Sequence, residues 1–225
     1  MVREKRETET QNLGFSSRPF VLCGLPVKRP KTGCLLHKRR NGQFVLQVTG
    51  HPSYGLPWGQ DRLVPIFLAT IAIRQQTPRI TFDSAAGMLD IFGMQQGGSQ
   101  YRRLVDSGQI RRGNALPLST ARGSISWPKP GYGTRVIPIR SSCRGLPNMI
   151  VLSDEFYREI SSHPIPTDLE AAKALSASPA ALDLFTWLSY RCFTARGRER
   201  VPLFGDYGLV SQLGSADYSR PRKFR

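Results

Sequence analysis

The stretch LPWGQDRLVPIFLATIAIRQQTPRITFDSAAGMLDIFGMQQGGSQYRRLVDSGQI, residues 56–110, carries the clearest structural pattern in the chain. Apolar residues recur at helical spacing between Asp61 and Gln75, which predicts a helix with one strongly buried side. Asp61 suits its start, because an acidic side chain there accepts from unpaired amides and favours the helix dipole. Residues 79–82 alternate polar and apolar and predict a short strand. The residues expected on the buried side of the helix are Leu63, Ile66, Phe67, Thr70, Ile71 and Ile73.

The second half of this stretch predicts a helix over residues 85–92, a turn at Gly97-Gly98 and a third helix from Ser99. The third helix opens with polar and basic side chains, whereas Leu104 and Val105 are expected to face the core. Gln and Arg side chains pair with adenine and guanine edges, so this order is typical of a helix-turn-helix that reads DNA. The alternative is a surface helix with ordinary basic residues. The expected DNA contacts are Ser99, Gln100, Tyr101, Arg102 and Arg103.

The charge of the whole chain points to a polyanionic partner. Thirty-two Lys and Arg residues stand against 16 Asp and Glu, which gives a net charge of +16. Such an excess binds phosphate backbones by releasing counterions. Anionic membranes and ribosomal RNA share this chemistry, and we favour nucleic acid over them.

Other classes of protein find little support. The four cysteines are scattered, and Cys34 and His37 have no second pair of similar spacing, so we expect free thiols and neither a metal nor a cofactor. A rolling-circle nickase needs paired histidines, whereas His37, His51 and His163 are isolated, so we expect no enzyme. The apolar run 63–73 is too short to span a bilayer and the N-terminus lacks an apolar signal core, so we expect a cytoplasmic protein.

The segments around the opening stretch differ in character. Residues 1–43 are rich in Pro, Gly and basic residues and predict a disordered basic arm, in which Lys38, Arg39 and Arg40 contact phosphates; a solvated tail is the alternative. Residues 44–49 predict a strand. Residues 111–147 lack hydrophobic periodicity apart from 134–139 and are expected to be irregular. They are either a basic loop that follows phosphates or the product of a shifted reading frame.

Order returns at residue 148. We expect a strand over 149–152, helices over 154–160 and 168–175 around a turn at 161–168, and an amphipathic helix over 180–192. A strand over 198–204 and a helix over 207–213 would then repeat the plan of residues 61–110. The residues expected inward on the amphipathic helix are Leu182, Leu184, Phe185, Leu188 and Cys192.

Several long segments resemble the plasmid-encoded RepA-type replication initiators. They are LGFSSRPFVLCGLPVKRP (13–30), RRNGQFVLQVTGHPSYGLPWGQDRLVPIFLATIAIR (39–74), FDSAAGMLDIFGM (82–94), GGSQYRRLV (97–105), VLSDEFYREI (151–160), SPAALDLFTWLSYR (178–191) and GSADYSRPRKFR (214–225). The resemblance implies two winged-helix domains that bind repeated sites in double-stranded plasmid origin DNA and bring in the host initiator and helicase. It also implies that Tyr218, Arg220, Arg222 and Lys223 begin a second recognition helix, which the chain end truncates.

The sequence therefore predicts a mainly helical α+β fold with two winged-helix-like domains. The expected division is a basic arm 1–43, a first domain 44–110, an irregular basic segment 111–147 and a truncated second domain 148–225. The expected function is initiation of plasmid replication, and homodimer formation is left open. The alternatives are a transcriptional repressor of the same fold and an inactive initiator remnant.

Overall fold

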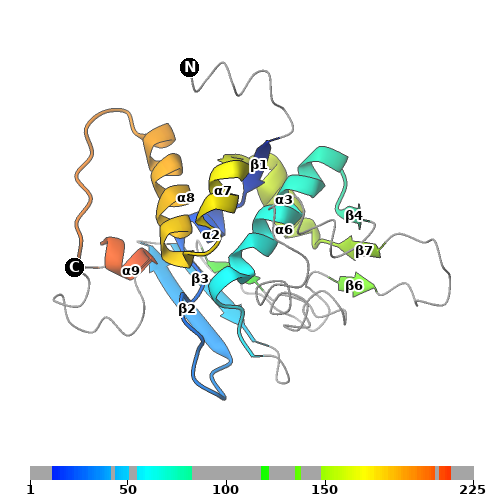
Figure 1. The fold of residues 1–225 in the computed structure, drawn as a ribbon, viewed down its shortest axis with the longest axis horizontal. Coiled ribbons are helices and arrows are strands. Elements are labelled where there is room, and N and C mark those ends of the chain that lie inside the picture. The colour runs from blue at the N-terminus through cyan, green and yellow to red at the C-terminus, as the bar shows by residue number, and fades with distance from the viewer. Residues whose placement is uncertain are drawn as a thin grey trace.

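The computed structural model describes residues 12–41, 44–50, 55–82, 118–121, 135–137, 148–205 and 208–213. Over these residues the fold is α+β, with three small antiparallel sheets placed around a central group of helices (Figure 1). The expected α+β class is confirmed at this level. The expected helix-turn-helix over residues 83–110 and the second recognition helix lie outside the described residues.

The central helix is α3, Leu63–Gln75, preceded by the 3-10 turn η1, Gly59–Arg62. Asp61 serves this turn, since its carboxylate accepts from the Trp58 amide at 2.9 Å. Every residue from 63 to 70 is buried, because β1, β4 and α6 surround the helix. The helix ends at Gln76, whose left-handed φ of 52° lets its amide bond back to Ala72. The predicted helix is confirmed, although its burial extends to all sides.

The N-terminal segment is ordered from residue 13 to residue 41. Strand β1, Leu13–Ser16, pairs antiparallel with β8, Ile165–Asp168, and helix α2, Arg18–Leu22, follows it. The Ser16 and Thr167 hydroxyls meet at 2.7 Å in this buried pair of strands. The predictions of an irregular arm here and of a turn at 161–168 are therefore wrong for these residues, because partners about 150 positions away supply the backbone bonds.

Two further sheets contain the remaining strands. In the first, β2 (Leu36–Asn41), β3 (Phe44–Thr49) and β5 (Leu118–Ala121) lie in that order. In the second, β7 (Asn148–Val151) lies between β4 (Arg79–Phe82) and β6 (Arg135–Ile137). The strands predicted at 44–49 and 79–82 are confirmed. The prediction that 111–147 is irregular is wrong for β5, whereas β6 falls within 134–139, where the sequence keeps an apolar pattern.

The C-terminal half contributes helices α6 (Asp154–Ser162), α7 (Leu169–Leu175), α8 (Pro179–Thr194) and α9 (Leu209–Leu213). Side chains cap the first two: Ser153 Oγ accepts from the Phe156 amide, and the Asp168 carboxylate accepts from two amides of α7. Residues 198–204 form no strand, so the expected repeat of the plan of residues 61–110 is not completed there.

The side of helix α8 that packs against the core differs from the side predicted from its apolar residues. The buried residues of this helix are Leu182, Asp183, Thr186 and Trp187. The placement of Leu184, Leu188 and Cys192 on the inward side is therefore wrong, since Leu184 and Leu188 are 38% and 45% exposed and the Cys192 thiol is exposed. The inward side is set by the partner that Asp183 finds in the core, which is described below.

One hydrophobic core joins both halves of the chain. Leu46 of β3 and Phe67 of α3 belong to the same buried cluster as Ile160 of α6 and Leu182 of α8. The described parts of the two expected domains thus share their apolar interior. None of the described helices is long and apolar enough to cross a membrane.

Candidate nucleic-acid interface

Strand β2 presents two cations to solvent. Side chains alternate across a strand, so Lys38 and Arg40 lie on one side of the sheet with Leu36, and all three are exposed. In the antiparallel register Lys38 lies opposite Gln47 and Arg40 opposite Val45 of β3, which carry no negative charge. Lys38 and Arg40 therefore reach solvent from the same side of β2, which is an edge strand of its sheet. We call Lys38 and Arg40 the β2 cations.

Arg39 lies on the opposite side of the same strand and is 8% exposed. Its Nη1 donates to the Ser211 carbonyl of α9 at 3.4 Å. Burial lowers the pKa of Arg39 below its ordinary value, and the Asp183 carboxylate opposes that shift. The prediction that three consecutive cations share one DNA-facing surface is therefore wrong for Arg39, which supports the strand from the inside.

His37 and Cys23 lie on the inner side of the β2 strand region. The His37 Nε2 donates to the Gly24 carbonyl at 3.0 Å, since a carbonyl oxygen only accepts. Burial lowers the pKa of His37 to about 4, so the ring is neutral at pH 7. Burial likewise raises the pKa of the Cys23 thiol to about 12, which makes it unreactive. His37 is bonded to a backbone carbonyl and Cys23 belongs to the hydrophobic core, so both side chains support the fold.

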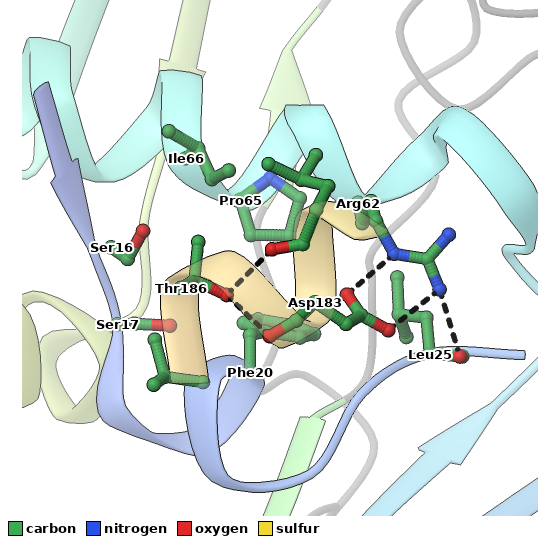
Figure 2. A pocket seen from close by; sticks show the side chains of 11 residues that line it. Ser16, Ser17, Phe20, Leu25, Arg62, Pro65, Ile66, Asp183 and Thr186 are labelled. Atoms are coloured by element: carbon green, nitrogen blue, oxygen red, sulfur yellow. Dashed lines mark hydrogen bonds and ion pairs between the residues drawn. The ribbon is translucent and has the colours of Figure 1, made fainter. Parts of the chain in front are cut away.

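A buried ion pair joins the turn η1 to helix α8 (Figure 2). Arg62 Nε donates to Asp183 Oδ1 at 2.7 Å and Nη2 donates to Oδ2 at 3.1 Å, and the two side chains are 4% and 7% exposed. The same guanidinium donates to the Leu25 carbonyl at 2.9 Å and to the Gly59 carbonyl. Burial raises the pKa of Asp183 and the Arg62 charge opposes it. The bidentate geometry fixes the orientation of α8 relative to η1. The bond to the Leu25 carbonyl also connects this pair to the loop that follows α2.

The cavity beside this pair is too small for a substrate. Its volume of about 20 Å³ is close to that of one water molecule, whereas ligand pockets span several hundred Å³. Ser17 Oγ lines it, buried and without a protein partner (Figure 2). In the part of the chain that the structure describes, no group of three His, Cys, Asp or Glu residues could hold a metal ion.

Most predicted DNA contacts fall outside the described residues. These are residues 99–103 and the second set, Tyr218, Arg220, Arg222 and Lys223, and their DNA contacts stay a prediction. A further exposed basic segment, residues 196–200, was not predicted as a site. Its signal in the sequence is the ARGRER run at residues 195–200, two positions after the aromatic Phe193.

The fold and its surface define a strongly basic α+β protein with an exposed cationic edge strand. Residues 141–203 match the family model described as "Plasmid encoded RepA protein". The resemblance to RepA-type proteins predicted from the sequence is thereby confirmed, over a segment that runs from β7 through α8 into the following loop. No curated protein and no solved structure matches the chain.

Proposed function

We propose that this protein is a plasmid replication initiator that binds repeated duplex sites at a plasmid origin without a catalytic step of its own. The match of residues 141–203 to the RepA family carries the proposal. The net charge of +16 and the exposed β2 cations support it, because duplex DNA is bound chiefly through its phosphates. The proposal includes two winged-helix-like units, a cytoplasmic location, and the host initiator and helicase as partners; homodimer formation remains a second hypothesis.

Within this proposal the cations divide into two roles. Residues 99–103, with Arg102 and Arg103 foremost, read base edges from the third helix of the opening stretch. Lys38 and Arg40 are assigned to phosphate, because phosphate oxygens take most hydrogen bonds in protein–DNA interfaces and fix the position of the protein on the duplex. Arg39 has no DNA contact in this scheme, since its side chain faces α9.

The test measures binding to the origin repeats and to a scrambled duplex of equal length over a salt series. Specific recognition predicts tighter binding to the repeats, and Arg102→Ala should then weaken repeat binding by about 1–3 kcal/mol with little effect on the scrambled duplex. Lys38→Ala/Arg40→Ala should weaken both duplexes alike and lower the salt slope by about 2. Equal affinity of the unmodified protein for both duplexes would refute sequence-specific recognition.

The matched control replaces two exposed cations on other elements, Arg158→Ala on α6 and Lys173→Ala on α7. Figure 1 shows both helices above β2 in that view. If the control lowers the salt slope as much as the β2 variant does, the β2 cations are not a specific contact surface. Supplying the protein in trans to a plasmid that carries only the origin then separates initiation from binding alone, since replication is read as transformants.

A further inference from the structure

The last turn of α8 and the loop after it carry exposed aromatic and basic side chains close together in the sequence. Phe193 is 83% exposed, and Leu203 and Phe204 are 54% and 45% exposed. Arg196, Arg198 and Arg200 lie between them and are all exposed. We call residues 193–204 the α8 loop.

Phe193 projects beyond the core and does not cover it. It follows Thr186 by seven residues and so lies on the same side of α8, yet Thr186 is only 8% exposed. The last turn of the helix thus extends past the body of the protein. Exposing a phenyl ring to water costs hydrophobic free energy, so such a ring, followed in the sequence by three exposed arginines, is typical of a binding surface.

The single acid of the loop is already engaged. Glu199 is the one Asp or Glu residue between 193 and 204, and its Oε2 lies 2.6 Å from Nη2 of Arg191 on α8. Arg191 also stacks over the Trp187 ring, with 5.7 Å between the guanidinium carbon and the ring centroid. The Arg191–Glu199 pair holds the loop against the helix and leaves the charge of Arg196, Arg198 and Arg200 uncompensated by that acid.

The other end of the loop is fixed by α9. The Leu209 and Val210 amides donate to the Pro202 and Leu203 carbonyls, each at 3.0 Å. Figure 1 shows the loop leaving the upper end of α8 and descending along its outer side to α9. Because it is held at both ends, the loop presents its side chains with a reduced entropy cost on binding.

We propose that the α8 loop binds single-stranded DNA. Unpaired bases stack on exposed aromatic rings such as Phe193, while the arginines contact the phosphates. Bases in a duplex are stacked on one another and offer no such face, so the ring gives preference for the single strand. An anionic membrane would also attract arginines and phenyl rings, but interfacial binding of that kind uses an amphipathic helix, whereas these arginines lie in a loop. The site goes beyond duplex recognition and requires neither β2 nor residues 99–103.

The test uses fluorescence anisotropy of the full chain with labelled oligo-dT, a duplex of equal length, and phosphatidylcholine–phosphatidylserine vesicles. Phe193→Ala should weaken oligo-dT binding about tenfold, which corresponds to stacking on one base, and leave duplex binding within about twofold. Phe193→Trp should restore or strengthen oligo-dT binding. Arg196→Ala/Arg198→Ala/Arg200→Ala should lower the oligo-dT salt slope by about 2, unlike the Arg158→Ala/Lys173→Ala control.

The two DNA proposals fail separately in this design. Equal affinity for the origin repeats and the scrambled duplex would refute duplex recognition alone. The loop proposal is tested by the affinity of the Phe193 variants for oligo-dT. Equal binding by Phe193→Ala and the unmodified protein would overturn it, as would a parallel loss of oligo-dT and duplex binding. Vesicle binding without oligo-dT binding would assign the loop to membranes instead. An unchanged Tm of Phe193→Ala, expected for a side chain that is 83% exposed, excludes misfolding as the cause.

Discussion

Replacing Asp183 by Ala should destabilise the protein by about 3–5 kcal/mol, because it leaves the Arg62 guanidinium buried without a countercharge. The magnitude follows from the geometry of the pair, which is bidentate at 2.7 and 3.1 Å with side chains only 4% and 7% exposed. The Leu25 and Gly59 carbonyls would still accept from Arg62 but carry no charge. A domain of ordinary stability unfolds with about 5–15 kcal/mol, so this one change removes a large share.

A double-mutant cycle separates the pair from simple packing. Arg62→Met leaves a buried Asp183 carboxylate without its partner, whereas Arg62→Met/Asp183→Leu replaces both charges by apolar side chains. We expect the double variant to be far more stable than the sum of the single losses predicts, because breaking a buried ion pair costs more than replacing it. Urea unfolding followed by far-UV circular dichroism gives each free energy, provided the m-value stays constant.

The control is Asp154→Ala, which removes an exposed acid from the first turn of α6 and should cost less than about 1 kcal/mol. A loss for Asp183→Ala no larger than that of the control would refute the ion pair as the element that orients α8. The ion pair would also be refuted if the loss of unfolding free energy in the double variant equalled the sum of the two single losses within about 0.5 kcal/mol. If Asp183→Ala does not fold, recovery of folding in the double variant still decides the question.

Two further predictions concern the same region. Gly24→Ala should cost about 1–3 kcal/mol in urea unfolding, because a Cβ there would overlap the Asp183 carboxylate; an unchanged midpoint would contradict this. His37 has a folded pKa of about 4 against 6.5 unfolded, so its contribution is complete above pH 6.5 and is lost as the pH falls toward 4. Between pH 7 and pH 5 the unfolding free energy of the unmodified protein should therefore fall by about 2 kcal/mol more than that of His37→Gln. Equal falls in the two proteins would contradict this role of His37.

Local patterns in the sequence predict the elements that are stabilised locally. The alternation at 79–82, the apolar spacing of 63–75 and the Ser153 cap each identify an element that the structure contains. Strand β8 is not predicted by its local sequence, because the short IPTD segment with Pro166 is typical of a turn. It forms a strand because β1, far away in the sequence, pairs with it.

The candidate site was predicted in part for a similar physical reason. The composition of residues 38–40 indicates a basic cluster, but only pairing with β3 decides that Arg39 faces inward while its neighbours face solvent. On α8, apolar character favoured Leu184 and Leu188 as core residues. The core instead takes Asp183, because Arg62, 121 positions earlier in the chain, provides the partner that a buried carboxylate requires.

The two proposed DNA contacts are joined through the short helix α9. Gln212, which is 5% exposed, accepts at one Oε1 from Asn41 of β2 at 3.0 Å and from the Trp187 indole of α8 at 2.8 Å. The α8 loop ends on the amides of the same helix. Helix α9 thus contacts β2 and α8 through Gln212 and also holds the C-terminal end of the α8 loop. A protein that holds a duplex at the first surface and an unpaired strand at the second would favour the opened DNA over the closed duplex by the free energy of the second contact, which is the thermodynamic requirement for opening an origin.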